Sequence, residues 1–270
     1  MTVPNGSGPS DLAGLVARGP NLAELDALAK GPPMVAIDAL VAGYGTTQIL
    51  HEVNLRVGAG QSLCLIGPNG AGKSTVLHSI FGFARVLSGR IVVGGNDVTR
   101  LPPSEKLRTA GIAYILQENS VFPDMTVEDN LLMGGFLLPH PRQAVEAAER
   151  MFSKYPRLAQ RRSEHASALS GGERRLLEIA RALVMDPAVL LVDEPSIGLE
   201  PRYIEMVFDM LRELQRRDGK TIVLVEQNAR KGLEFSDIAY VLISGRVEMA
   251  GVGAELARDP DIGRLFLGGP

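Results

Sequence analysis

The stretch GPNGAGKS at Gly67–Ser74 decides the fold of this 270-residue chain. It matches the pattern G-x-x-x-x-G-K-[ST], and it lies between QSLCLI, an apolar run typical of a strand, and TVLHSIF, which has helical character. Glycines allow backbone N–H groups to turn inward around phosphate oxygens, and the following helix directs the positive end of its dipole at them. The stretch therefore predicts a strand, a phosphate-binding loop and a helix, in that order.

The side chains of the loop predict Mg-ATP as its ligand. Lys73 can reach the β and γ phosphates, and the Ser74 hydroxyl can ligate magnesium. A glycine-rich turn without a chemical role is the alternative interpretation, and the strand–loop–helix context argues against it. We expect the nucleotide to contact Gly67, Pro68, Asn69, Gly70, Ala71, Gly72, Lys73, Ser74 and Thr75.

From Met34 onward, short β-branched runs alternate with amphipathic segments, which is typical of a sheet covered by helices. Between the runs IAYIL and VLLVDE, helix signals dominate, including two capping boxes formed by Thr126 with Asp129 and by Ser170 with Glu173. The sequence therefore predicts an α/β fold with a helical subdomain at about residues 118–185, inserted between two core strands. The strand candidates are Met34–Leu40, Gln61–Gly67, Ile112–Leu116, Val189–Glu194, Thr221–Glu226 and Ile238–Ser244.

Residues 1–33 are rich in Gly, Pro and Ala, and we expect them to form a flexible N-terminal extension. Within it, Asn21 and Glu24 fit a capping box for a short helix that ends at Gly31. We expect this helix to be solvated or loosely docked. The folded domain then comprises residues 34–270.

Composition and charge exclude several functional classes. A formal net charge of -3 gives no basic surplus for nucleic acid, which we therefore exclude as a direct ligand. The apolar runs fall far short of the ~20 residues that a membrane span requires. The N-terminus lacks the basic start and apolar stretch of a secretory signal. With Cys64 as the only cysteine, an internal disulfide is impossible, and we expect a cytoplasmic compartment.

Two acidic residues, Asp193 and Glu194, follow the apolar run VLLV. This is the position of functional residues at the exit of a buried central strand. Asp193 would hold magnesium directly or through water, and Glu194 would orient or deprotonate the attacking water. The pair is weakly informative alone, but after a phosphate loop it predicts ATP hydrolysis.

The string LSGGE at Leu169–Glu173 predicts a second anion-binding helix terminus. Ser170 fits the N-cap, Glu173 completes the capping box, and Gly171 and Gly172 leave their backbone N–H groups bare. A chain with one nucleotide loop has no obvious need for a second such site. We infer that these residues contact the ATP of a second copy in a head-to-tail dimer. A capping box without a ligand is the alternative.

The ordered set GPNGAGKST, LSGGE and VLLVDEP resembles the nucleotide-binding subunit of ATP-binding cassette (ABC) transporters, over nearly everything from Met34 to the end. The resemblance implies a P-loop NTPase core of the ABC ATPase type with an N-terminal antiparallel β region. It implies that Tyr44 in VAGYG stacks on adenine, although a half-buried strand aromatic is the alternative. Gln117 in YILQEN would contact magnesium and face the membrane subunit. Ser196–Glu200 is placed like the D-loop of the family.

Gln227 in TIVLVEQNA departs from the family pattern, which usually has a histidine that contacts the γ-phosphate at this position. Glutamine can donate a hydrogen bond to a phosphate oxygen, but it cannot carry charge. We assign Gln227 a catalytic role beside Glu194. We expect hydrolysis to be slower than with histidine, or to depend on an active partner subunit.

The strings VEQNA, VFPDMTVEDNLLMGG, EPSIGLEP and DPDIGRLFLGG together resemble one ATPase of the branched-chain amino acid importer, and the urea and short-amide importers share much of this wording. The resemblance implies an ATP-hydrolysing subunit that is peripheral to the cytoplasmic face of the cell membrane. Its implied partners are integral membrane permease subunits, a second ATP-binding subunit (itself or a sibling) and, indirectly, a solute-binding protein.

Two other classes of function stay open at this point. A soluble ABC protein of DNA repair or translation should carry a coiled-coil insertion, a second cassette or a basic surface, and none appears in the sequence. A nucleotide-gated clamp without significant hydrolysis is suggested by Gln227. Comparing phosphate release by the wild type and by a Glu194 variant separates the clamp from the ATPase.

Overall fold

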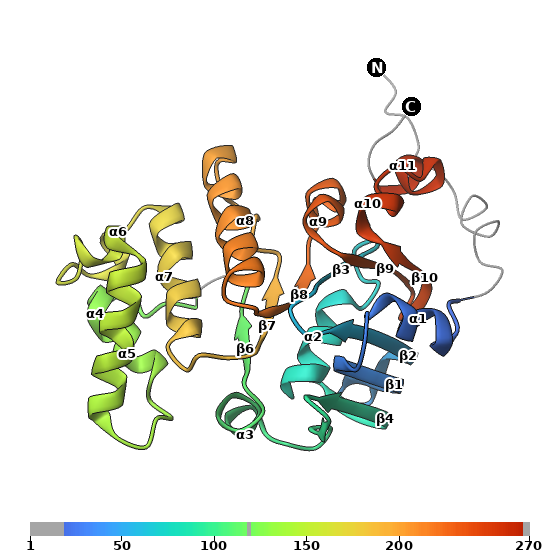
Figure 1. Ribbon diagram of the computed structural model, residues 1–270, viewed down its shortest axis with the longest axis horizontal. Coiled ribbons are helices and arrows are strands. Elements are labelled where there is room, and N and C mark those ends of the chain that lie inside the picture. Colours follow the sequence, from blue (N-terminus) through green and yellow to red (C-terminus); the bar gives the residue numbers. More distant parts are fainter. Residues whose placement is uncertain (1–18, 118–119, 267–270) are drawn as a thin grey trace.

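The computed structural model describes residues 19–117 and 120–266, in which two β-sheets lie among helices (Figure 1). The elements are α1 (Leu22–Leu28), β1 (Pro33–Tyr44), β2 (Thr47–Gly58), β3 (Ser62–Ile66), α2 (Lys73–Phe81), β4 (Arg85–Val93), β5 (Asn96–Asp97), α3 (Pro103–Arg108), β6 (Ile112–Ile115), α4 (Val127–Gly134), α5 (Pro141–Lys154), α6 (Pro156–Ala159), η1 (Ala166–Ala168), α7 (Gly171–Leu183), β7 (Val189–Asp193), α8 (Pro201–Arg216), β8 (Thr221–Val225), α9 (Ala229–Phe235), β9 (Ile238–Ile243), β10 (Arg246–Val252), α10 (Gly253–Leu256) and α11 (Pro260–Phe266). Each of the six strand candidates coincides with a strand, which confirms the α/β prediction.

The larger sheet has six strands in the order β10-β9-β3-β8-β7-β6, with β10 antiparallel at one edge and the others parallel. Every residue of β3, β7 and β8 is buried. Leu63 and Leu65 of β3 pack into one hydrophobic core. Cys64 and Ile66 pack into the other, on the opposite face of the sheet. Burial on both faces explains why these strands read as continuous apolar runs.

The strand order brings three carboxyl ends together. β8 lies between β3 and β7, with Leu65 paired to Val225 and Val225 paired to Asp193. Because parallel strands point the same way, the loops that follow β3, β8 and β7 open onto the same edge of the sheet. The phosphate loop, the Glu226–Gln227 segment and the acidic pair therefore all lie at this edge.

The smaller sheet has the order β2-β1-β4-β5, and all of its pairs are antiparallel. It confirms the antiparallel β region expected near the N-terminus. Strands β2, β4 and β5 were not among the strand candidates. In β4 the burial pattern begins with largely exposed residues, so its sequence lacks the continuous apolar run that marks a central strand.

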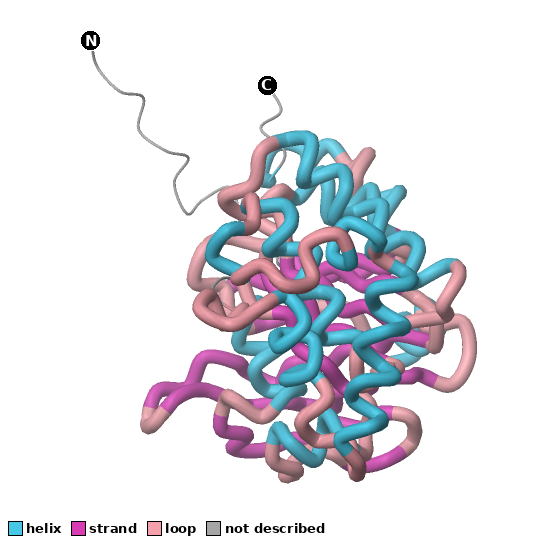
Figure 2. The backbone as a smooth tube through the Cα atoms, turned by 90° about the vertical axis from the view of Figure 1, so that its left-hand side faces the viewer, coloured by secondary structure: helices cyan, strands magenta, loops and turns pink. Residues whose placement is uncertain are grey.

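The helices between β6 and β7 form a group of their own at the left of Figure 1, and they lie in front of the strands when viewed from that side (Figure 2). Both expected capping boxes are present, at Thr126 with Asp129 and at Ser170 with Glu173. These helices fall within the expected subdomain, whose limits at about residues 118–185 stay a prediction because residues 118–119 lie outside the described ranges.

Helix α1 differs from the loosely docked segment that was expected. The Asn21–Glu24 capping box is present, but Leu25 is fully buried and Asp26 forms an ion pair with Arg56 of β2 at 2.9 Å. Gln61 also donates a hydrogen bond from Nε2 to the Leu28 carbonyl oxygen at 3.2 Å. Residues 22–28 therefore pack against the domain through Leu25, whereas the flexibility expected for residues 1–33 stays a prediction. Residues 1–18 lie outside the described ranges.

Across residues 19–117 and 120–266, no helix has both the length and the apolar character needed to cross a membrane.

Candidate nucleotide-binding site

The phosphate loop connects the buried strand β3 to helix α2. Gly67 has φ +151°, and a Cβ atom built there would lie 2.1 Å from the Leu242 carbonyl oxygen of β9. Only glycine fits such a close approach of two backbone segments. Because α2 begins at Lys73, the unpaired N–H groups of its first turn belong to the residues that the motif assigns to phosphate binding.

Lys73 places a buried cation in this loop. Its Nζ donates to the carbonyl oxygens of Gly67 at 2.9 Å and Pro68 at 3.0 Å, and the residue is only 6% exposed. Burial lowers the pKa of Lys73, and the carboxylates of Glu194 and Asp193 oppose this shift. The ammonium group is thus held among carbonyl dipoles and carboxylates, where a triphosphate would provide a stronger anionic partner.

Asp193, at the end of β7, is the buried carboxylate of the site. Its Oδ1 accepts a hydrogen bond from Ser74 Oγ at 3.0 Å, and its Oδ2 accepts one from the Tyr114 hydroxyl at 2.7 Å. Burial and the nearby Asp193 charge raise the pKa of Tyr114, so that the hydroxyl keeps its proton and donates it. From the sequence, Tyr114 was expected only to belong to the strand candidate Ile112–Leu116. No sequence pattern indicated its contact with Asp193.

The residues expected to hold magnesium fit that ion in part. Ser74 and Asp193 present two hard oxygen ligands 3.0 Å apart, which suits a cation that takes one or two protein ligands and completes its shell with phosphate oxygens and water. Across residues 19–117 and 120–266, no group of three or more His, Cys, Asp and Glu side chains is placed so that it could hold a metal ion. Gln117 contacts Glu194 in this structure, and its contact with magnesium stays a prediction.

Glu194 is held by its backbone and by Gln117. It has φ +43°, in the left-handed region that non-glycine residues rarely adopt, and Gln117 Nε2 donates to its Oε2 at 3.1 Å. Such strained conformations concentrate at functional sites. Burial and the charge of Asp193 raise the pKa of Glu194, which makes the carboxylate a stronger base for an attacking water.

Glu226 joins two loops of the site, and sequence reasoning missed it. The residue is buried, and its Oε1 accepts hydrogen bonds from Ser196 Oγ at 2.7 Å and from the Asn228 backbone N–H at 2.9 Å. It therefore ties the D-loop-like segment after β7 to the segment after β8. A single glutamate at the end of a strand gives no specific signal. The adjacent Gln227 side chain is exposed, and its contact with the γ-phosphate stays a prediction.

Tyr44, at the end of β1, is 42% exposed. Its hydroxyl forms a hydrogen bond with His78 Nδ1 of α2, and the two rings meet edge-on with centroids 5.9 Å apart. Burial lowers the pKa of His78, which favours the neutral ring that can accept this bond. This arrangement suits the stacking of a flat base, but adenine binding by Tyr44 stays a prediction.

The LSGGE segment begins helix α7. Ser170 Oγ accepts a hydrogen bond from the Glu173 N–H at 3.3 Å, and Glu173 Oε2 accepts one from the Ser170 N–H at 3.0 Å. Gly171 is exposed, whereas a Cβ atom at Gly172 would lie 2.0 Å from the ring of Tyr203. Helix α7 belongs to the helical group at the left of Figure 1, apart from α2. A role toward the ATP of a second copy stays a prediction.

Arg175 ties helix α7 to the nucleotide site, which the sequence did not indicate. The buried guanidinium donates from Nη1 to the Leu116 carbonyl oxygen at 2.7 Å and to Glu178 Oε2 at 2.6 Å. Leu116 immediately precedes Gln117. The helix that begins with the LSGGE segment is therefore connected to the backbone that carries Gln117.

Comparison with known families agrees with this geometry. The family model described as ABC transporter matches residues 50–197, a span that includes the phosphate loop, LSGGE and the acidic pair. The chain therefore belongs to the ABC transporter family.

Several curated relatives align along most of the chain. A high-affinity branched-chain amino acid transport ATP-binding protein, BraG, from Pseudomonas aeruginosa is 42% identical, over 84% of this chain and 96% of the relative. A probable branched-chain amino acid transport ATP-binding protein, LivF, from Archaeoglobus fulgidus is 39% identical, over 84% of this chain and 95% of the relative. A lipopolysaccharide export ATP-binding protein, LptB, from Acidithiobacillus ferridurans is 36% identical over 83% of this chain and 92% of the relative.

Solved structures place the fold in the same group. An ATP-binding cassette of an ABC transporter in its ADP conformation has a TM-score of 0.77 at 28% identity, over 88% of this chain and 100% of that chain. A dimeric ATP-binding cassette in a post-hydrolysis state, bound to ADP and Pi, has a TM-score of 0.68 at 25% identity, over 81% and 98%. The chain is thus an ATPase of the ABC class and the ATP-binding subunit of a transporter.

Proposed function

We propose that this chain is the ATPase of an importer for branched-chain or other amino acids, and that it binds permease subunits at the cytoplasmic face of the membrane. The observation that carries the proposal is that Lys73, Ser74, Asp193 and Glu194 lie together at one edge of the larger sheet. Lys73 and Ser74 begin the helix that follows β3, and Asp193 and Glu194 stand at the end of β7. The similarity to two branched-chain amino acid transport proteins supports the solute class.

Each side chain has a separate task in the proposed reaction. Lys73 binds the β and γ phosphate oxygens, and Ser74 with Asp193 would hold magnesium, which when bound neutralises phosphate charge. Glu194 accepts a proton from the water that attacks the γ-phosphorus, so that ADP and phosphate are the products. Gln227 donates a hydrogen bond to the γ-phosphate in place of the usual histidine.

A second copy of the chain, or a sibling ATPase, completes the site. The free N–H groups at the start of α7 would bind the γ-phosphate of ATP held by the partner, so that nucleotide binding closes the dimer and hydrolysis opens it. The dimeric structure of a similar cassette supports this assembly.

The identity of the transported solute has less support than the assignment of ATP hydrolysis. The relatives named above include an export protein, and solute choice belongs to permease and solute-binding subunits. Amino acids are favoured because the more similar of these relatives are amino acid transport proteins. Urea and short amides are the alternative solutes.

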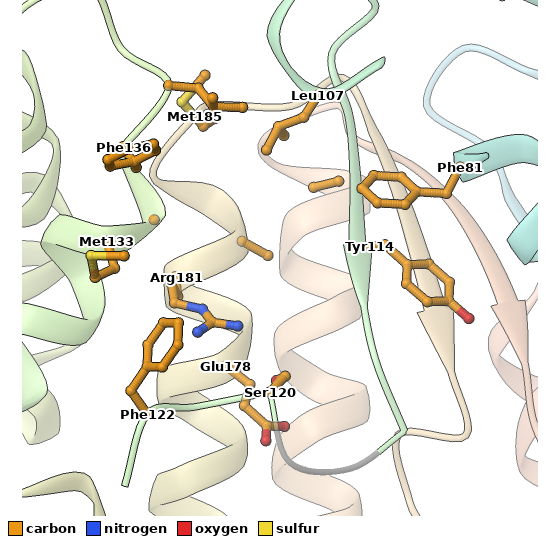
Figure 3. A pocket seen from close by; sticks show the side chains of 14 residues that line it. Phe81, Leu107, Tyr114, Ser120, Phe122, Met133, Phe136, Glu178, Arg181 and Met185 are labelled. Carbon is orange, nitrogen blue, oxygen red and sulfur yellow. The ribbon is translucent and has the colours of Figure 1, made fainter. Parts of the chain in front are cut away.

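A cavity of about 420 Å³ between α4, α7 and β6 offers a docking site for the permease (Figure 3). Phe136, Met133 and Phe122, three of the exposed large apolar side chains, line it, and Phe136 is 77% exposed. Exposed apolar patches mark sites of protein contact. We place an amphipathic helix of the permease here because the cavity combines this apolar wall with the charged groups of Glu178 and Arg181.

Glu194→Gln should abolish phosphate release while leaving ATP binding intact, because the amide keeps the size of the carboxylate but cannot accept the proton. Phosphate release and nucleotide retention by the purified proteins provide the measurement. Equal background rates in the wild type and the variant would favour a nucleotide-gated clamp and overturn the ATPase assignment for this chain.

Ser170→Arg should leave ATP binding by the monomer unchanged and prevent ATP-dependent dimerisation, because a long cation would occupy the space that the partner's triphosphate needs. Analytical ultracentrifugation of the Glu194→Gln background, with and without ATP, measures the dimer. Dimerisation that is unchanged by Ser170→Arg would rule out the proposed sandwich.

Phe136→Glu should release the chain from membranes of its source cells and reduce leucine uptake at least tenfold, because a carboxylate would replace the most exposed aromatic of the cavity. Val145→Glu on α5 is the matched control, since Val145 is also an exposed apolar residue but does not line the cavity. Retention of both membrane binding and uptake in Phe136→Glu would contradict the docking site. Loss of urea uptake in place of leucine uptake would identify the alternative solute.

A further inference from the structure

The carboxylate of Asp193 has different partners on its two oxygens. Ser74, from the phosphate loop, donates to Oδ1, and Tyr114 donates to Oδ2. The Ser74 contact belongs to the nucleotide motif. The Tyr114 contact comes from β6, a strand that carries no part of that motif, and it has no role in the chemistry described so far.

Packing fixes the position of the Tyr114 hydroxyl. The ring stacks on Phe81 with centroids 5.5 Å apart and an interplanar angle of 23°. Phe83 and His78 meet the same ring edge-on, each at a centroid distance of 5.7 Å. A tyrosine held by three rings loses little further freedom when its hydroxyl binds a carboxylate, so the hydroxyl is a preorganised donor.

We propose that Tyr114 is a positioning residue for the magnesium of Mg-ATP: its hydroxyl binds Asp193 Oδ2 and thereby keeps Oδ1 turned toward Ser74, where the ion would be held. This inference rests on the proposed function of the site. Hydrogen bonds to a ligating carboxylate orient it, and the loss of such a partner typically weakens metal binding about tenfold or more.

The same ring forms part of the wall of the docking cavity. Tyr114 and Phe81 line it opposite Phe136 and Met133, and the Tyr114 hydroxyl points away from those two residues in Figure 3. The side chain that orients Asp193 is therefore one that a docked permease helix would contact.

Tyr114→Phe tests the inference, because it keeps the aromatic packing and removes only the hydroxyl. Tyr240→Phe is the matched control. Tyr240 is also a buried tyrosine of the larger sheet, and its hydroxyl donates to the Arg56 carbonyl oxygen at 3.1 Å, away from the nucleotide site. Both variants lose a buried hydrogen bond, but only one of these bonds involves Asp193.

The measurements are the ATP affinity of the full chain in EDTA and the Mg²⁺ concentration that half-saturates the magnesium-dependent rise in Tm with ATP present. We expect Tyr114→Phe to raise that concentration about tenfold, with ATP affinity in EDTA unchanged. Tyr240→Phe should lower the ligand-free Tm and leave the magnesium dependence as in the wild type.

Wild-type magnesium dependence in Tyr114→Phe, or an equal shift in both variants, would overturn the positioning role while the proposed function stands. Failure of the wild type itself to bind ATP would overturn the proposed function and this inference together.

Discussion

The contact on which the site depends is that of the Lys73 ammonium group with the carbonyl oxygens of Gly67 and Pro68. It holds a largely buried cation in the loop before the first turn of α2, whose free backbone N–H groups also favour an anion, so the loop suits a polyphosphate before any ligand arrives. The constraint comes from the buried strand β3, because the loop leaves that strand against β9 at a glycine where no side chain fits. The other functional groups are arranged around this cation.

The order of the strands also fixes where the other segments of the site lie relative to the phosphate loop. With β8 between β3 and β7, the acidic pair, the Glu226–Gln227 segment and the phosphate loop share one edge of the sheet. Links between elements then couple this edge to its surroundings. Glu226 joins the loops after β7 and β8, Arg175 joins α7 to the backbone before Gln117, and Tyr114 joins Asp193 to the wall of the docking cavity. These contacts connect the nucleotide-binding edge of the sheet to the surfaces where partners are proposed.

The sequence predicted the elements whose signal is local. Continuous apolar runs predicted the buried strands, and the spacing of Ser170 and Glu173 predicted a helix start. The phosphate loop indicated Ser74 and the acidic pair indicated Asp193, and the strand order brings these two residues into contact. The sequence could not predict contacts that depend on tertiary packing. Tyr114, Glu226 and Arg175 each occur in ordinary strand or helix contexts. The partner that links each of them to the site is distant along the chain, and these partners are Asp193, Ser196 and the Leu116 carbonyl group, respectively. Docking of α1 was missed because burial of Leu25 depends on a surface formed by other elements.

The most direct test of this account is the ATP affinity of Lys73→Ala, measured by isothermal titration calorimetry in magnesium buffer. Lys220→Ala is the control, because Lys220 is a largely buried lysine whose partner is Asp186, outside the site. The account predicts no detectable ATP binding by Lys73→Ala at concentrations that saturate the wild type and Lys220→Ala. ATP affinity of Lys73→Ala within twofold of the wild type would contradict it.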